Sequence, residues 1–183
     1  MNIHRIYWPV YALGPGARLG IWTRGCARRC PGCMSPDLRD AGPSHDVPME
    51  ALIRSMNVLF TRYDIQGVTI SGGEPLDQPD DLETLIRALR PHTSDILLYT
   101  GYTQDEIDAD PRLFRASSEA GVIVSGPYVA ALNDGRPLRG SSNQQIRFRR
   151  RELEEKYAPT LAGVREIQVG ESGTSVFLIG LLG

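Results

Sequence analysis

The sequence has 183 residues, 41% of them hydrophobic and 23% charged, and its formal net charge is −2. This balance gives no electrostatic reason to expect nucleic acid or an anionic membrane as a partner. No apolar run approaches the roughly 20 residues that span a bilayer, and residues 1–9 lack the long apolar core of a signal peptide. We therefore expect a cytoplasmic protein with a single domain over residues 1–183.

Apolar runs rich in β-branched residues alternate with helical patterns along the chain. The expected strands are residues 19–23, 68–71, 96–100, 122–125, 166–169 and 176–179. The expected helices are residues 49–62, 79–90, 104–108 and 112–120. This alternation predicts an α/β fold with a parallel sheet. In such folds the chemistry gathers at the C-terminal ends of the strands.

The segment after residue 135 has a weaker pattern. Residues 140–143 indicate a loop, which either contacts a partner around Asn143 or only makes a turn. A run of arginines and glutamates over residues 147–155 indicates a solvated charged face whose charges pair with one another.

The three cysteines form a C-x3-C-x2-C run, Cys26, Cys30 and Cys33, directly after the first expected strand. An odd number of cysteines on so short a loop does not make a disulfide framework. Thiolates are soft ligands that suit zinc or iron–sulfur centres. An ordinary cubane cluster takes four cysteines, so three would leave one iron open, as a catalytic zinc keeps one position open for substrate.

Two other interpretations of this loop remain. The cysteines could form a Cys3His zinc site with His45 or His4, in a zinc-stabilised binding module without catalysis. One cysteine could be a nucleophile, but no nearby pairing of a histidine with an acid supports that.

A second motif, Gly72-Gly73-Glu74, follows the strand at 68–71. The glycines permit a close approach of backbone to a ligand. The Glu74 carboxylate could accept charge-assisted hydrogen bonds from a ligand ammonium group. Because both motifs follow strands of one expected parallel sheet, we expect them at the same end of the fold.

Together the two motifs resemble the radical S-adenosylmethionine (radical SAM) superfamily. The cysteine run is similar to its cluster motif, and Ser71-Gly-Gly-Glu-Pro75 to its methionine-binding motif. The lead-in at residues 14–18 and 24–26 is similar to that of activases of glycyl radical enzymes. The segments 30–33, 98–102, 125–128 and 137–144 are similar to the short activases of anaerobic (class III) ribonucleotide reductase.

The resemblance implies a partial (β/α) barrel of about six parallel strands. It implies one 4Fe–4S cluster on Cys26, Cys30 and Cys33, and S-adenosylmethionine held by Gly72, Gly73 and Glu74. Thr100 and Ser125, at the ends of the next two strands, are expected to make further contacts with the cofactor. No catalytic residue beyond these cluster and cofactor ligands is expected.

The implied activity is reductive cleavage of S-adenosylmethionine to a 5′-deoxyadenosyl radical, which generates a glycyl radical on anaerobic ribonucleotide reductase. A low-potential electron donor such as flavodoxin or ferredoxin would be a second partner. One departure keeps an alternative open: Met34-Ser-Pro-Asp37 follows the third cysteine, where these activases usually carry Tyr-Asn. The alternative is a radical SAM enzyme that modifies a small molecule or a peptide in a biosynthetic pathway.

Overall fold

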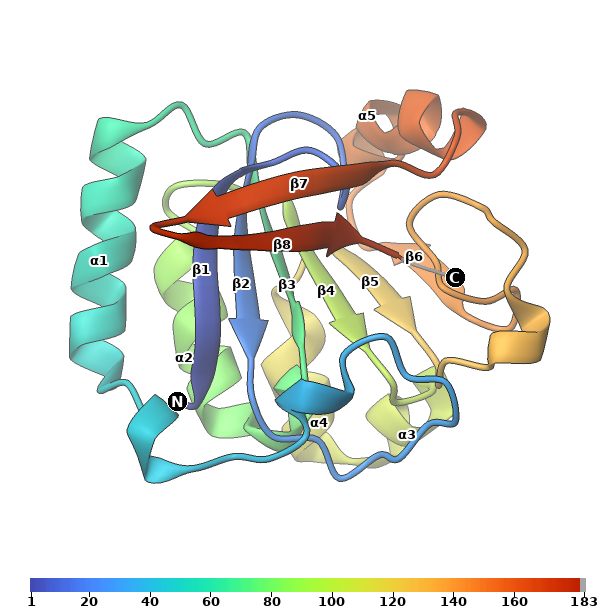
Figure 1. Ribbon diagram of the computed structural model, residues 1–183, viewed down its shortest axis with the longest axis horizontal. Coiled ribbons are helices and arrows are strands. Elements are labelled where there is room, and N and C mark those ends of the chain that lie inside the picture. The colour runs from blue at the N-terminus through green and yellow to red at the C-terminus, as the bar shows by residue number, and fades with distance from the viewer. Residues whose placement is uncertain (182–183) are drawn as a thin grey trace.

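The computed structural model describes residues 1–181, and its centre is a six-stranded sheet in the order β1-β2-β3-β4-β5-β6 (Figure 1). The strands are β1 (Ile3–Val10), β2 (Arg18–Thr23), β3 (Gly67–Gly72), β4 (Ile96–Thr100), β5 (Val122–Ser125) and β6 (Gln145–Phe148). The four inner strands, β2 to β5, are parallel, whereas β1 and β6 pair antiparallel with their neighbours at the two edges. The C-terminal ends of the parallel strands therefore form one rim of the sheet.

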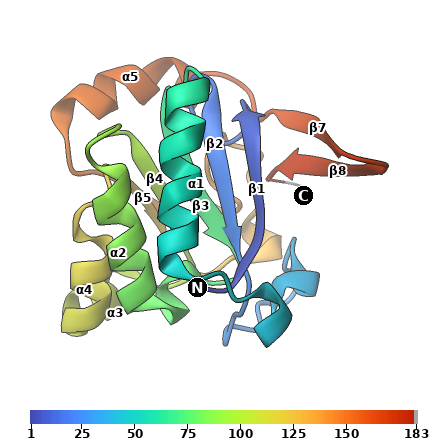
Figure 2. The same cartoon turned by 90° about the vertical axis from the view of Figure 1, so that its left-hand side faces the viewer.

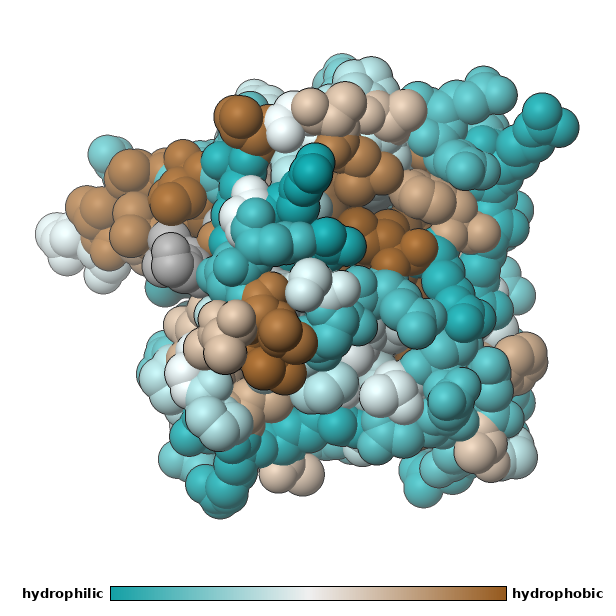
Figure 3. Space-filling model, turned by 90° about the vertical axis from the view of Figure 1, so that its right-hand side faces the viewer, coloured by the Kyte–Doolittle hydropathy of each residue, from teal (hydrophilic) through white to brown (hydrophobic). Residues whose placement is uncertain are grey.

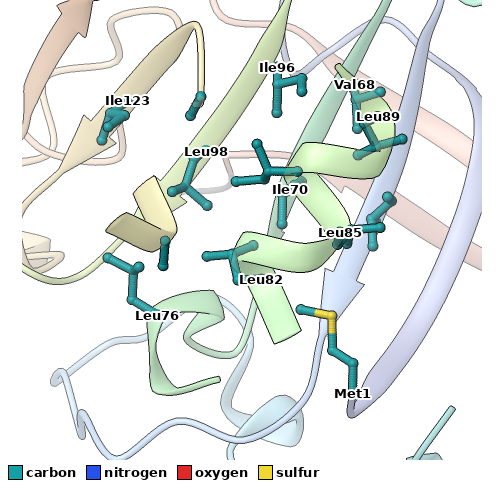
Figure 4. Close-up of a cluster of buried hydrophobic side chains, with 14 of the residues drawn as sticks. Met1, Val68, Ile70, Leu76, Leu82, Leu85, Leu89, Ile96, Leu98 and Ile123 are labelled. Atoms are coloured by element: carbon teal, nitrogen blue, oxygen red, sulfur yellow. The ribbon is translucent and has the colours of Figure 1, made fainter. Parts of the chain in front are cut away.

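Helices cover one face of this sheet. They are α1 (Met49–Arg62), α2 (Pro79–Leu89), α3 (Gln104–Ala109) and α4 (Pro111–Ser118), and Figure 2 shows α1, α2 and α4 on the same side. The apolar stripe of α2 is fully buried against β3 and β4, and Figure 4 shows this cluster with Leu82, Leu85, Leu89, Val68, Ile70, Ile96 and Leu98 labelled. Among residues 1–181, the helices are too short or too polar to cross a membrane.

A hairpin of β7 (Ile167–Ser172) and β8 (Ser175–Gly180) lies across the opposite face, and α5 (Arg151–Ala162) lies near the N-terminal ends of the parallel strands (Figure 1). Leu153 and Tyr157 of α5 and Ile179 of β8 are buried with residues from β4 and β5. Four short 3-10 helices lie in the connections, at Pro36–Leu38, Pro43–His45, Pro75–Asp77 and Ala130–Leu132.

The helices are confirmed to within a few residues, and α1 has the predicted bounds. The prediction of about six parallel strands in a partial barrel is confirmed in part. The inner strands are parallel, but β1 and β6 are antiparallel, the sheet is not closed, and β7 and β8 pair with each other outside it. Only Gly173 and Thr174 separate β7 from β8. A link this short closes an antiparallel hairpin, because a parallel crossover needs a dozen or more residues.

The expected charged face at residues 147–155 is confirmed in part. Most of its arginines and all of its glutamates are exposed, but residues 147 and 148 belong to the edge strand β6, and residues 151–155 begin α5. Leu153 is buried there, which gives this helix a packing face. Within residues 1–181, no ion pair joins the arginines of this run to its glutamates.

A buried ion pair holds the N-terminal ends of the parallel strands together. The Arg18 guanidinium forks onto Asp95, with Nη1–Oδ2 at 2.9 Å and Nη2–Oδ1 at 3.0 Å. Its Nε donates to Thr69 Oγ1 at 2.7 Å, and the Tyr157 hydroxyl donates to Asp95 Oδ1 at 2.6 Å. Burial alone would raise the pKa of Asp95, but the hydrogen bonds and charge of Arg18 hold that pKa below its ordinary value.

Candidate iron–sulfur site

The cysteine motif and the Gly-Gly-Glu motif line one cavity, of about 130 Å³, at the C-terminal rim of the sheet. The lining residues are Cys26, Arg28, Cys30, Cys33, Met34, Ser71, Gly72, Gly73, Glu74, Tyr99, Thr100, Gly101, Gly126, Tyr128, Gln144 and Leu181. The expectation that parallel strands bring both motifs to one place is therefore confirmed. Ser125, in contrast, is buried and does not line the cavity, whereas the next residue, Gly126, does.

Backbone hydrogen bonds shape the cysteine loop. After β2 ends, the Gly25 amide donates to the carbonyl of Leu38, and the Cys26 amide donates to the carbonyl of Arg39, each at 2.9 Å. The start of the loop is thereby paired with its end, so the loop closes on itself. The side chain of Arg24 strengthens this closure, since its Nη2 donates to the carbonyl of Asp37 at 2.8 Å.

The three thiols are free and partly buried. The Cys33 amide donates to the carbonyl of Cys30 at 3.2 Å, which makes a turn between these two cysteines. Burial raises the pKa of the Cys26 thiol above its ordinary value. Among residues 1–181, no three His, Cys, Asp or Glu side chains are grouped to hold a single metal ion. A cubane cluster does not require such a group, because each thiolate binds its own iron; three soft donors around one cavity fit it.

The two glycines of the second motif interlock it with the cysteine loop. The Gly73 amide donates to the carbonyl of Thr23 at 2.9 Å, and the Glu74 amide donates to the carbonyl of Gly25 at 2.7 Å. Gly72 has a φ of +117°, in the left-handed region that favours glycine. A Cβ atom on Gly73 would overlap the carbonyl oxygen of Gly25. The close approach that these glycines allow here is therefore between the two motifs.

Glu74 joins the ends of β3 and β4. Its Oε1 accepts from the Leu76 amide at 2.9 Å and from Thr100 Oγ1 at 2.8 Å, and its Oε2 accepts from the Gly101 amide at 2.7 Å. The side chain is only 1% exposed, and this burial raises the pKa of Glu74 to about 7 despite the three hydrogen bonds. A carboxylate offers about four acceptor positions, so one remains for a ligand.

Two buried hydroxyls beside the site lack hydrogen-bond partners among residues 1–181. They are Ser125 Oγ, which was predicted as a contact, and Tyr99 Oη, which was not. Tyr99 lines the cavity, and burial raises its pKa above the ordinary value. Its place at the C-terminal end of β4, next to the predicted Thr100, was the signal that could have found it. Predicted Thr100 also lines the cavity, and its hydroxyl contacts Glu74.

A network that the sequence did not reveal attaches the cysteine loop to the loops after β3 and β4. The Arg28 guanidinium lies 4.1 Å from the ring centroid of Tyr102 and donates to both carboxylate oxygens of Glu106 at 2.8 Å. The Tyr102 hydroxyl donates to Asp77 Oδ1 at 2.9 Å, and Asp77 Oδ2 accepts from the Ala27 amide at 2.7 Å. Three loops are therefore tied together around the cavity.

The loop at residues 140–144 closes the cavity beside β5. The Gln144 side chain donates to the carbonyl of Gly126 at 2.9 Å and accepts from the Gly140 amide at 2.7 Å. Asn143 Nδ2 donates to the carbonyl of Pro127 at 2.8 Å. Both side chains thus hold the loop against the segment that follows β5, and Gln144 forms part of the cavity wall.

Comparison with known proteins supports an iron–sulfur cluster in this chain. Residues 12–147 match the family described as "4Fe-4S single cluster domain". A similar protein from Escherichia coli (strain K12), named anaerobic ribonucleoside-triphosphate reductase-activating protein, is 33% identical over 155 residues, covering 80% of this chain and 97% of that protein. Proteins of the same name from Enterobacteria phage T4 and Haemophilus influenzae are 30% and 34% identical, covering 80% and 76% of this chain and 93% and 94% of those proteins. The chain therefore belongs to the 4Fe–4S single cluster domain family and to the family of anaerobic ribonucleoside-triphosphate reductase-activating proteins.

Proposed function

We propose that this chain is a radical SAM enzyme that generates a glycyl radical on anaerobic ribonucleotide reductase, with residues 1–183 acting as one radical SAM domain. Cys26, Cys30 and Cys33 hold one 4Fe–4S cluster, and S-adenosylmethionine binds beside it. The observation that carries this proposal is the convergence of the cysteine loop and the Gly-Gly-Glu motif on one cavity. The names of the similar proteins support the choice of partner.

When bound and reduced by a donor such as flavodoxin or ferredoxin, the cluster would supply the electron for cleavage of S-adenosylmethionine to methionine and a 5′-deoxyadenosyl radical, which would take a hydrogen atom from a glycine of the partner. The residues of this chain bind the cluster and the cofactor and orient them. Three thiolates anchor the iron, and the free acceptor position of Glu74 takes a hydrogen bond from the ammonium group of the cofactor. Gly72 and Gly73 keep the two motifs in contact.

The size of the cavity supports a protein partner. Its volume of about 130 Å³ is smaller than the roughly 300–1,000 Å³ of most small-molecule pockets. A cofactor as large as S-adenosylmethionine therefore extends beyond the cavity mouth. A reactive radical must be kept from water, so we propose that the reductase covers this mouth when its glycine-bearing loop enters.

The test is anaerobic reconstitution followed by electron paramagnetic resonance. Reconstituted protein should hold about four irons and four sulfides per chain. After reduction, and with S-adenosylmethionine and a class III reductase present, a glycyl radical signal should form together with one 5′-deoxyadenosine per radical at early times. A colourless protein that takes up zinc instead would support the binding module. A radical accepted only by a metabolite or a peptide would support the alternative radical enzyme.

A further inference from the structure

The β7–β8 hairpin is anchored to the body through its inner face. Phe177 lies edge-on to Tyr7, with ring centroids 5.1 Å apart, and the Arg5 guanidinium lies 3.5 Å from the centroid of the Phe177 ring. Gln168 adds two hydrogen bonds, because its Oε1 accepts from the Tyr11 amide at 2.8 Å and its Nε2 donates to the carbonyl of Pro9 at 2.7 Å. These contacts hold the hairpin in one orientation.

The outer face of the same hairpin is also apolar. Successive side chains of a strand point to opposite sides, and Val169 pairs directly with Leu178 on the side away from the body. Four aliphatic side chains are exposed there, Ile167 by 56%, Val169 by 58%, Val176 by 67% and Leu178 by 58%. Figure 3 shows this hydrophobic patch projecting from the body, and nothing within residues 1–181 covers it.

This outer face, made of Ile167, Val169, Val176 and Leu178, continues toward the cysteine loop. The β8 edge of the hairpin lies beside this loop, because Phe177, Leu178 and Ile179 line a second cavity, of about 210 Å³, together with Met34 and Ser35. Met34 also lines the cavity of the candidate iron–sulfur site, as does Leu181, which follows β8. A protein that covers the mouth of that cavity would therefore meet the hairpin next.

We propose that the outer face of the β7–β8 hairpin is a docking surface for aliphatic side chains of the reductase that receives the radical; this rests on the proposed function. Four such side chains form a patch on the order of 400 Å², about half of the roughly 800 Å² that each side of a standard interface buries. The patch alone is too small to hold two copies of this chain together. A reductase that covers the cavity mouth would also contact the residues around that mouth, and these supply the remaining area. The hairpin lies beyond residue 147, where the match to the 4Fe–4S single cluster domain family ends. It therefore provides surface that is not part of that domain.

The test is a pair of substitutions on the outer face, Val169→Ser with Val176→Ser. Both side chains are exposed in the free protein, so the variant should fold. The matched control is Val58→Ser on α1, which is 62% exposed and lies on the other side of the sheet (Figure 2). We expect about tenfold weaker binding of the reconstituted variant to the class III reductase, with cleavage of S-adenosylmethionine in the absence of reductase unchanged. The glycyl radical yield should recover at high reductase concentration, and the control should behave as wild type.

Three outcomes would overturn the docking surface. Unchanged reductase affinity with normal radical formation would remove it and leave the proposed function intact. A wild-type dimer that becomes a monomer in the variant, again with unchanged reductase affinity, would assign the face to a second copy. If wild type and variant both carry the cluster and neither gives a glycyl radical on any reductase, the proposed function fails, and the docking surface fails with it.

Discussion

The two ends of the parallel strands differ in how completely their buried charged and polar groups are paired. At the N-terminal end, the fully buried Arg18 places all its N–H groups on acceptors of the chain, and Asp95 accepts half of these hydrogen bonds. At the C-terminal end, Glu74 is equally buried but has no cationic side chain bonded to it, and the hydroxyls of Tyr99 and Ser125 lack partners among residues 1–181. Buried polar groups normally find hydrogen bonds. The satisfied end therefore stabilises the fold, and the unsatisfied end is suited to a ligand.

The largest expected effect is at the cysteine loop. Cys26→Ala, Cys30→Ala or Cys33→Ala should each abolish the cluster, because a missing thiolate leaves a second iron without a protein ligand. The fold should survive, since backbone hydrogen bonds close the loop. Iron and sulfide analysis of anaerobically reconstituted protein, with circular dichroism of the apo form, measures both effects. Ser35→Ala, in the same loop, is the control and should load normally. Full iron content in any cysteine variant would disprove the ligand assignment.

At the opposite end, Asp95→Ala should lower the free energy of unfolding by about 3–5 kcal/mol, because it leaves Arg18 buried without its counter-charge. Urea denaturation of the apo protein measures this loss. Asp80→Ala removes the exposed pair with Arg112 at 3.0 Å and should cost less than about 1 kcal/mol. Because folding lowers the pKa of Asp95, the contribution of this group to the stability of the fold depends on pH. The contribution is present above the ordinary pKa of 3.8 and is lost as the pH falls through the folded-state pKa. Equal losses in the two variants would argue against a structural role for the pair.

Glu74 should show the opposite dependence on pH and a smaller effect. Its pKa rises from 4.5 to about 7 on folding, so the unfolded chain releases the proton first, and the free energy of unfolding falls as the pH rises from 4.5 to about 7. Glu74→Gln should flatten that slope in the apo protein. In the reconstituted protein it should weaken S-adenosylmethionine binding by about 2 kcal/mol, as expected for one charged hydrogen bond. Calorimetry measures the affinity, with Glu83→Gln on α2 as the control; unchanged affinity would remove Glu74 from the cofactor site.

The elements of the fold that could be predicted are those whose secondary structure is determined by a local pattern of apolar residues. The bounds of α1 follow from its apolar stripe, and β2 to β5 follow from short apolar runs between helices. The same kind of run at β7 and β8 led to the wrong pairing, because the residues of a buried parallel strand and of a hairpin look alike. What distinguishes them is the length of the connection, and Gly173–Thr174 is too short for a crossover.

The site residues that could be predicted are those that belong to short sequence motifs. The cysteine spacing and the Gly-Gly-Glu run could be found because each is contiguous in sequence. The contacts among Arg28, Tyr102 and Asp77 could not, because they join residues far apart in the chain and the sheet alone brings them together. Tyr99 lies inside an apolar strand and packs with core residues, so in the sequence it looks like a core residue although it also lines the cavity.

The closure of the cysteine loop by its own backbone has a consequence for how the protein is matured. Many small metal-binding modules fold only when the metal arrives, so that removing the metal unfolds them. Here the amides of Gly25 and Cys26 bond to the far end of the loop, and the Glu74 amide bonds to the carbonyl of Gly25, so backbone groups of the chain fix the loop to the end of β3. We therefore expect the loop to keep its fold when the cluster is lost. Iron and sulfide could then be reinserted into a folded chain, without new synthesis.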